Sequence, residues 1–468
     1  MDDVETSAAG SPAAPVTLAV VGAGHRGADA YGDFCLRHPE QARVVAVAEP
    51  DPVRREEFGR QHGIPAELRF DSWEALLARE RLSDGLVVAT PDAVRAGPVV
   101  AGARLGYDLL LEKPIAPNEE QLAQIMRALD GADVMVGVAH VLRYTTFFTT
   151  IKRLLEEGAV GRLLHVEQAE DVGYWHFSHS YVRGSWRRAD ISSPLLLAKA
   201  CHDLDLLTWL VDQPVASVHS AGSLTHFTER NAPPGAPARC TDGCPAADTC
   251  PFYAPRLYLD RLRDQDIWPA TAVTRDRGAA ARRRALETGP YGRCVYRCDN
   301  DAVDQQVVTL TFDDGRMATL RVSAFTASNT RTIRLLGSHG EISGRLDTGR
   351  VEVRRFLPAP GTTIGRHVPW DRDDQGRSGL PDDERWTIDA APVRPAGAHV
   401  EPGRHESDGH AGGDDGLMRE FVGNVRRRIR GERADLPTEI ADAERSHLIA
   451  FAAERSRRSG AAVDLLGA

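Results

Sequence analysis

The stretch VTLAVVGAGHRG, residues 16–27, decides the fold of this chain. Residues 16–21 form a short apolar, β-branched run, which is typical of a strand buried on both faces. Gly22, Gly24 and Gly27 follow at once in the spacing GxGxxG, and residues 28–37 can form a helix. The first glycine permits a tight turn, the second lets a pyrophosphate approach the backbone, and the third lets helix and strand pack closely.

This loop predicts a dinucleotide site, with the pyrophosphate on the N–H groups of the helix N-terminus. A second strand, 43–48, ends in Glu49, about where an acidic residue binds the ribose hydroxyls. Because a carboxylate repels a 2′-phosphate, Glu49 favours NAD over NADP. Arg54 and Arg55 follow closely and weaken that preference.

Composition and charge limit the classes of function. The 468 residues are enough for two or three domains, and 42% are apolar. The net charge of −10 argues against a general nucleic-acid binder. No apolar run reaches the ~18 residues of a membrane helix. Residues 1–15 are acidic, small and proline-containing, so we expect a disordered tail rather than a signal peptide, and a cytoplasmic protein.

Strand and helix signals alternate up to residue 140. Further strands are expected at 84–89, 107–111 and 134–138, with a helix at 117–129 and a break at Thr90-Pro91. Such alternation predicts right-handed βαβ units and a parallel sheet with helices on both faces. The chain is therefore predicted to be an α/β protein, with a doubly wound NAD-binding Rossmann domain at 16–140.

After residue 140 the pattern changes. A helix at 145–157 precedes a half-buried strand at 163–171 and a helix near 195–211. Strand patterns then occur at 216–225, 303–312, 317–325, 332–336 and 351–356. They predict an α+β domain, 141–468, on an open, mainly antiparallel sheet. Residues 358–412 are rich in Pro, Gly, Asp and Arg, so we expect an irregular surface segment before closing helices at 414–430 and 439–458.

The chain resembles the Gfo/Idh/MocA oxidoreductases, the glucose–fructose oxidoreductase and inositol dehydrogenase family. Residues 22–27, GAGHRG, are similar to its dinucleotide loop, and Thr90-Pro91 to its cofactor-contacting turn. The sequence Glu112-Lys113-Pro114 resembles the family's EKP signature, and His202-Asp203 its second catalytic motif. The resemblance implies cofactor contacts from Gly22, Gly24, His25, Arg26, Gly27, Glu49, Thr90, Pro91, Glu112 and Lys113.

Two positions depart from the family pattern. Arg95 stands where many members carry a histidine, and Ala198 where many carry an aspartate four residues before the catalytic histidine. Lys199 precedes His202 by three residues, which on a continuous helix places both on one face. The resemblance and this spacing make Lys113, Lys199 and His202 the candidate catalytic residues, and leave open which accepts the proton. We expect Asp203 and Asp205 to orient neighbours, and Pro114 can follow a cis peptide bond that aims Lys113.

Candidate substrate contacts lie in two stretches. The first follows the last Rossmann strand, where the domains join and substrate is expected. The second, 174–188, is unusually rich in aromatic, His and Arg residues for a loop, which suits a polyhydroxylated or anionic ligand. The candidates are His140, Arg143, Tyr144, His179, Tyr181, Arg183 and Trp186, with His410 a weaker one.

Five of the seven cysteines cluster in an insert, 229–300. Cys240, Cys244 and Cys250 have the spacing Cx₃Cx₅C, and Cys294 and Cys298 the spacing Cx₃C. In a reducing cytosol such a cluster suggests a metal. The spacing fits no standard zinc finger or ferredoxin, so structural zinc, an iron–sulfur cluster and free thiols stay open, with zinc preferred.

These features predict an NAD-dependent dehydrogenase that oxidises a secondary alcohol of a sugar, inositol or glycoside. One alternative is NAD-dependent glycoside cleavage, which begins with the same oxidation and continues by elimination. Another is a non-catalytic NAD-binding regulatory protein. The strands of the second domain have too few helices to cover both sheet faces, so we expect a homo-oligomer, a dimer or tetramer.

Overall fold

The computed structural model describes residues 14–265, 267–276, 278–356, 384–390 and 410–466. The chain divides into two compact units. The first comprises residues 1–112, 124–139 and 417–439, and the second comprises residues 113–123, 140–416 and 440–468. Residues 1–13, most of the predicted tail, lie outside the described residues.

The first unit is built on a six-stranded parallel sheet, in the order β3-β2-β1-β4-β5-β6. Its strands are β1 (Val16–Val21), β2 (Ala42–Ala48), β3 (Arg69–Phe70), β4 (Gly85–Val88), β5 (Asp108–Leu111) and β6 (Val136–Val138). Its helices include η1 (His25–Gly32), α1 (Asp33–Arg37), α2 (Pro52–Gln61), α3 (Trp73–Leu77) and α4 (Ala96–Arg104), with parts of α5 (Glu119–Leu129) and α12 (Gly413–Ile429). Every residue of β4 and β5 is buried, as expected of strands covered on both faces. The predicted doubly wound sheet is confirmed.

Residues 417–439 pack with this first unit, although they follow the second unit in the sequence. Val138 donates its N–H to the carbonyl of Thr438 at 2.9 Å, so the chain continues the hydrogen bonding of the last strand. Phe421 and Leu417 on α12 are fully buried. The first unit therefore closes with a segment that the sequence analysis placed in the second domain.

The second unit is built on a nine-stranded sheet, in the order β14-β13-β12-β11-β7-β10-β9-β8-β15. Its strands are β7 (Leu163–Gly173), β8 (Val215–Ser223), β9 (Gln305–Phe312), β10 (Met317–Thr326), β11 (Thr330–Gly337), β12 (Gly340–Arg345), β13 (Arg350–Arg355), β14 (Glu384–Asp389) and β15 (Val463–Asp464). Only β7 and β10 pair in parallel, while all other neighbours are antiparallel. The predicted open, mainly antiparallel sheet is confirmed.

Three strands of this sheet were not expected: β12, β14 and the two-residue β15. β12 carries Gly340 and Gly344, which weaken a strand pattern. β14 lies inside the segment predicted to be irregular, and it pairs as an edge strand along the whole of β13. The expectation of an irregular segment was wrong for residues 384–389, and residues 357–383 and 391–409 lie outside the described residues.

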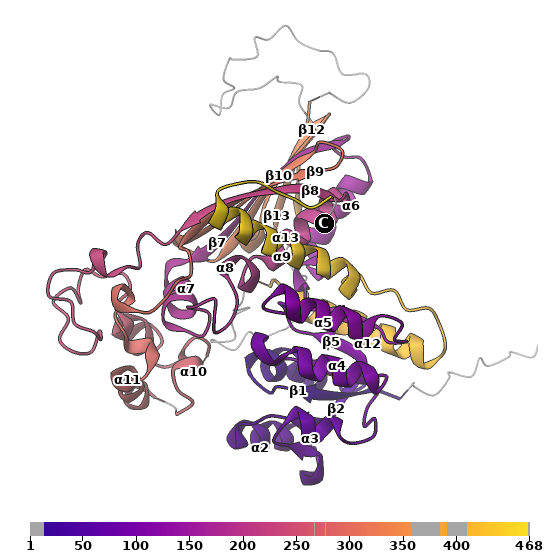
Figure 1. Cartoon of the computed structure of the whole chain (residues 1–468), viewed down its shortest axis with the longest axis horizontal. Coiled ribbons are helices and arrows are strands. Elements are labelled where there is room, and N and C mark those ends of the chain that lie inside the picture. The colour runs from indigo at the N-terminus through magenta and orange to yellow at the C-terminus, as the bar shows by residue number, and fades with distance from the viewer. Residues whose placement is uncertain (1–13, 266, 277, 357–383, 391–409, 467–468) are drawn as a thin grey trace, which may run out of the picture. The chain divides into compact units, whose positions relative to one another are not determined.

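The helices of the second unit fall into two groups. Those associated with the sheet include α6 (Thr146–Glu156), α8 (Leu195–Ala198), α9 (Cys201–Val211) and α13 (Ile440–Ser459), of which α9 contacts β7 and α13 contacts β8. The second group forms a helical region with the cysteine insert. It comprises α7 (Tyr174–Phe177), η5 (Ser178–Arg183), η7 (Arg256–Arg261), α10 (Ala270–Val273) and α11 (Ala279–Thr288). Figure 1 shows α10 and α11 beside α7, away from most of the sheet. None of the helices in the described part of the chain is both long enough and apolar enough to cross a membrane.

Candidate active site

The glycine loop after β1 has the shape that a dinucleotide requires. Gly22 has a φ of +94°, and its N–H donates to the carbonyl of Ala48 at 2.8 Å. A Cβ atom on Gly22 would lie 2.7 Å from the carbonyl oxygen of Ala89, and one on Gly27 would lie 1.9 Å from that of Gly22. Neither position can carry a side chain, so η1 begins directly above the strand end, and the loop fits a pyrophosphate.

Glu49 is held beside this loop at the end of β2. Its carboxylate is buried and accepts hydrogen bonds from the N–H of Ala23 at 2.8 Å and of Asp51 at 3.1 Å. Arg55 donates to the carbonyl of Glu49 at 2.6 Å, whereas Nη1 of Arg54 lies 3.9 Å from the position of a Cβ on Gly24. Arg55 is thus hydrogen-bonded to the backbone after β2, whereas Arg54 lies against the glycine loop.

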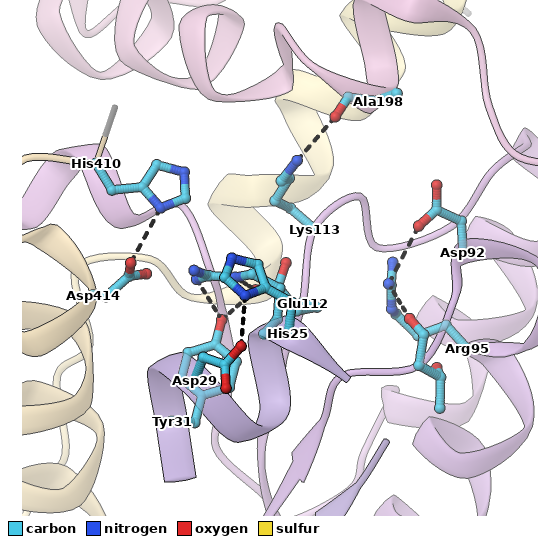
Figure 2. A network of polar contacts seen from close by, with 12 residues as sticks. His25, Asp29, Tyr31, Asp92, Arg95, Glu112, Lys113, Ala198, His410 and Asp414 are labelled. Carbon is cyan, nitrogen blue, oxygen red and sulfur yellow. Dashed lines mark hydrogen bonds and ion pairs between the residues drawn. The ribbon is translucent and has the colours of Figure 1, made fainter. Parts of the chain in front are cut away.

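Glu112, at the end of β5, binds the helix that follows the loop. It accepts a hydrogen bond from Nε of Arg26 at 2.5 Å. It also accepts one from the hydroxyl of Tyr31, as Figure 2 shows. His25 lies one residue earlier and contacts Asp29 through Nδ1 at 2.8 Å. Glu112 therefore fixes the position of η1 and the side chain of Arg26, and His25 lies at the helix start.

Arg95, the residue that replaces the family's histidine, supports the Thr90-Pro91 turn. Its side chain is 2% exposed and donates to the carbonyl of Thr90 at 2.5 Å, with Asp92 at 3.4 Å (Figure 2). Arg95 therefore positions the turn through its backbone.

Lys113 begins the second unit directly after Glu112, and the Lys113-Pro114 peptide bond is cis. Its Nζ donates to the carbonyl of Ala198, the last residue of α8, at 2.9 Å (Figure 2). Lys113 is thus hydrogen-bonded to the residue that directly precedes Lys199 in the chain.

The predicted helix over 195–211 is broken at Lys199 and Ala200. α8 ends at Ala198 and α9 begins at Cys201, because Ala200 has non-helical dihedral angles, φ −96° and ψ 9°. The expectation that Lys199 and His202 share one face of a continuous helix was wrong. Lys199 instead lies in the link before α9, with Nζ 3.4 Å from Oε1 of Glu170.

His202 lies in the first turn of α9 and is 3% exposed. Its ring contacts those of His140 and His410, at centroid distances of 5.6 and 5.5 Å. Neither ring nitrogen of His202 has a hydrogen-bond partner among the described residues, although both are buried. Burial, together with the positive charge of Lys113, lowers the pKa of His202 well below 6.5, so the ring is neutral near neutral pH.

A buried ionic network surrounds Lys199. Glu170 on β7 pairs with Lys199 and with Arg331 on β11, and Arg331 also binds Asp203 through Nε at 2.9 Å. Gln168 donates to the same Asp203 at 2.6 Å. Burial lowers the pKa of Lys199 below its usual 10.5 and raises that of Glu170 above 4.5, while their mutual attraction opposes both shifts.

Three members of this network were missed by the sequence analysis: Gln168, Glu170 and Arg331. A signal was present, because Gln168 and Glu170 continue the inward-facing alternation that begins with Val166. Polar residues on the buried side of a strand indicate a polar partner. Asp203 orients its neighbours, in agreement with the expectation.

The residues after β6 form part of the same unit. His140 is fully buried between the rings of His202 and His447, at 5.6 and 5.9 Å. Arg143 forms a buried two-point ion pair with Asp205, both distances being 2.7 Å, and Tyr144 beside it is partly exposed. The guanidinium of Arg143 is thereby directed at Asp205, whose expected orienting role the structure shows.

The stretch 174–188 is not a loop over its first ten residues, because α7 and η5 cover 174–183. His179 and Tyr181 are buried, with His179 bound to the hydroxyl of Tyr258 at 2.7 Å and stacked on Tyr291. Trp186 is partly exposed and lies at a separate pocket with Ser193 and Arg457. Three of the four candidates here, His179, Tyr181 and Arg183, are thus packed inside this helical region.

The zinc prediction has no support in the structure. Among residues 14–265, 267–276, 278–356, 384–390 and 410–466, no group of three or more His, Cys, Asp or Glu side chains is arranged to hold a metal ion. Cys35, Cys240, Cys244, Cys250, Cys294 and Cys298 form no disulfide.

Comparison with known proteins settles the family. Residues 16–140 match the model of the oxidoreductase family with an NAD-binding Rossmann fold, and residues 152–369 match that of the family's C-terminal α/β domain. The chain belongs to the Gfo/Idh/MocA oxidoreductase family. It is therefore an oxidoreductase with an NAD-binding domain, as the glycine loop and the EKP motif predicted.

Similar proteins include a putative oxidoreductase, YteT, of Bacillus subtilis, 23% identical over 64% of this chain and 69% of its own length. The inositol 2-dehydrogenase of Corynebacterium glutamicum strain R is 25% identical over 45% of this chain. Only 59% of that relative's length is covered. A levoglucosan dehydrogenase solved with NADH and levoglucosan has a TM-score of 0.64 at 18% identity, over 96% of this chain and 99% of that chain.

Proposed function

We propose that this protein is an NAD-dependent dehydrogenase of a polyhydroxylated small molecule, oxidising a secondary alcohol of a sugar, an inositol or a glycoside to a ketone. The main support for this proposal is the environment of His202. Both of its ring nitrogens are buried and have no hydrogen-bond partner in the described part of the chain. Buried polar atoms are normally paired, so an imidazole in this state calls for a ligand group. A hydroxyl both donates and accepts hydrogen bonds, and it fits such a ring.

The cofactor residues would lie in the first unit. Gly22, Gly24 and Gly27 leave room for the pyrophosphate, and Glu49 would bind the ribose hydroxyls. Bound in this way, NAD would supply the hydride acceptor for the reaction. Glu49 supports NAD as the preferred cofactor, while Arg54 near Gly24 is the feature that would favour NADP.

In the second unit, His202 would accept the hydroxyl proton as the hydride leaves. A neutral ring at working pH is the form that a base requires, and the lowered pKa of His202 provides it. Lys113 places positive charge near His202, and Lys199 lies close enough to Lys113 to interact with it electrostatically. The two lysines would stabilise the developing alkoxide. Glu170 would hold Lys199 in place for this role.

Substrate class is supported by the relatives. Two relatives are named for their substrates, inositol, which is a cyclic polyol, and levoglucosan, which is an anhydrosugar. Both are rings that carry secondary hydroxyls, which is the class proposed for this chain.

We further propose a homo-oligomer, in which a second copy covers the outer face of the nine-stranded sheet, where Val307, Met317 and Phe325 are exposed on neighbouring strands.

A panel of inositols, free sugars, anhydrosugars and aryl glycosides with NAD⁺ tests the proposal. We expect NADH formation with at least one member and a ketone product of unchanged carbon skeleton. Release of the aglycone would instead indicate oxidation followed by elimination. Binding of NAD without turnover of any member would favour a regulatory protein and contradict the dehydrogenase.

A further inference from the structure

One cavity of the second unit is lined by none of the candidate catalytic residues Lys113, Lys199 and His202. Its volume is about 110 Å³. By a measure in which one water occupies about 10–15 Å³, this is room for roughly seven to eleven waters, the scale of one monosaccharide ring. Three separate segments contribute its aromatic and polar lining, which comprises Trp186, Ser193, Asp301, Glu454, Arg457 and Arg458.

The last two turns of α13 form one wall of this cavity. Glu454, Arg457 and Arg458 have the spacing i, i+3, i+4, which places them on one face of the helix. Glu454 is 7% exposed, and it accepts hydrogen bonds from Nη2 of Arg457 at 2.9 Å and from Nε2 of Gln306 at 3.2 Å. Nη1 of Arg457 makes no hydrogen bond to the described residues. A buried carboxylate therefore fixes Arg457 and leaves it one donor for a ligand.

Two loops that bind each other form a second wall. The N–H of Ala189 donates to Oδ1 of Asp301, and the N–H of Asp301 donates to the carbonyl of Arg187, both at 2.9 Å. Nε of Arg187 also donates to Oδ1 of Asp299 at 2.9 Å. Oδ2 of Asp301 has no hydrogen-bond partner and no ion pair among the residues that the structure describes. The loops thus hold a carboxylate oxygen in place that can accept from a ligand.

Trp186 supplies the apolar surface of the cavity, together with Pro194 and Leu195. Its ring is partly exposed and packs against Tyr181 at a centroid distance of 6.1 Å. Its indole N–H makes no hydrogen bond within the described part of the chain. A tryptophan with one apolar face and one polar handle is suited to a ligand that is itself amphipathic.

The charges that line the cavity determine the charge of the ligand. Arg457 and Arg458 are positive, and Glu454 and Asp301 are negative, so these four side chains sum to zero. A ligand with a full charge would therefore meet a group of its own sign in the cavity. A neutral ligand whose groups both donate and accept would match the arginine donors and the aspartate acceptor, and hydroxyls have this property.

We propose that this cavity binds one ring of a neutral sugar or cyclic polyol, at a site separate from the one that contains His202. The ring would pack its C–H face on Trp186, and its hydroxyls would donate to Asp301 and accept from Arg457. Because the walls are formed by hydrogen bonds within the protein, little ordering is needed on binding. The site takes no part in the proposed dehydrogenase reaction, so the failure of either proposal leaves the other intact.

Titration of the whole chain without NAD tests the site. The probes are methyl glucoside, methyl galactoside, methyl mannoside and myo-inositol, with methyl glucuronide as the anionic comparison, followed by saturation-transfer NMR. We expect saturable millimolar binding of at least one neutral probe, with the same affinity in His202→Gln. Absence of saturable binding by every neutral probe, or binding of the glucuronide alone, would overturn the proposal.

Substitutions then locate the bound ring. Trp186→Ala should weaken binding about tenfold or more by removing the packing surface. Asp301→Asn keeps an acceptor for the N–H of Ala189 but loses the charge, and it should weaken binding about tenfold. Arg445→Met is the matched control, because Arg445 is exposed on the same helix and does not line the cavity.

The control should bind the probe as the wild type does, and circular dichroism shows whether each variant is folded. Unchanged affinity in folded Trp186→Ala and Asp301→Asn would refute the site. Loss of binding in His202→Gln would assign the bound ring to the catalytic site instead.

Discussion

Replacement of His202 by glutamine gives the sharpest test of the proposed chemistry. Glutamine is polar and close in size to histidine, but its amide cannot take a proton at working pH. His202 makes no hydrogen bond to the described protein, so the change removes none from the folded state. We therefore expect a small loss of stability and a large loss of turnover.

The magnitude follows from the role of a positioned base, which contributes roughly 10²–10⁴ in rate. This range corresponds to about 3–5 kcal/mol of lost transition-state stabilisation. An interaction made mainly in the transition state lowers kcat and kcat/KM together, so both should fall by similar factors. Affinity for NADH should stay nearly unchanged, because the glycine loop and Glu49 belong to the other unit.

The assay is the initial rate of NADH formation with the best substrate of the panel, as a function of pH. Because the pKa of His202 is well below 6.5, the wild-type acid limb should lie below that value, and His202→Gln should remove it. Exposed His219 provides the control, and His219→Gln should leave rate and profile unchanged. Near-normal turnover of His202→Gln with an intact acid limb would refute the reasoning and shift the base to Lys113 or Lys199.

Three further predictions concern the cofactor, acid stability and assembly. NADH should bind more tightly than NADPH in a fluorescence titration, and Glu49→Ser should weaken NADH about 10- to 100-fold by loss of a charged hydrogen bond; equal affinities in the wild type would contradict this. Burial lowers the pKa of His179 to about 3, whereas the unfolded chain takes up this proton near pH 6.5. Stability should therefore fall as pH decreases through this window, by up to about 1.4 kcal/mol per pH unit for this group, and urea unfolding of His179→Gln should show a shallower loss. Light scattering at micromolar concentration should give at least twice the mass of one chain, because Val307, Met317 and Phe325 are 40–47% exposed on one sheet face, and a monomer would refute the proposed assembly.

Much of the first unit could be predicted from the sequence because its determinants are local. Gly22 and Gly27 are required by contacts with backbone atoms of the loop and of the residues that follow β4, and the buried parallel strands show as short apolar runs. The expected NAD-binding domain and family follow from this pattern together with the EKP motif. The Lys113-Pro114 peptide bond is cis, a geometry that proline makes accessible but that the sequence does not decide.

The candidate catalytic site was predicted only in part. Lys113, Lys199 and His202 were named from motifs, but their surroundings come from elements far away in sequence. Glu170 meets Lys199 from β7, and Arg331 joins Asp203 across 128 positions. The link at Lys199 and Ala200 breaks the expected helix, which no local helix signal indicated, because Leu, Ala and Lys all favour helices.

The sequence by itself determined the glycine turn, the alternation of the first sheet and the identity of the thiols, because sterics, hydrophobic period and composition act over a few residues. Only the tertiary structure decided that β7 pairs in parallel with β10, that residues 417–439 close the first unit, and that Cys294 meets Cys240 around one cavity. Those arrangements depend on burial and hydrogen bonding between segments up to several hundred positions apart. Such contacts gain their free energy only when the whole fold forms, so no local pattern records them.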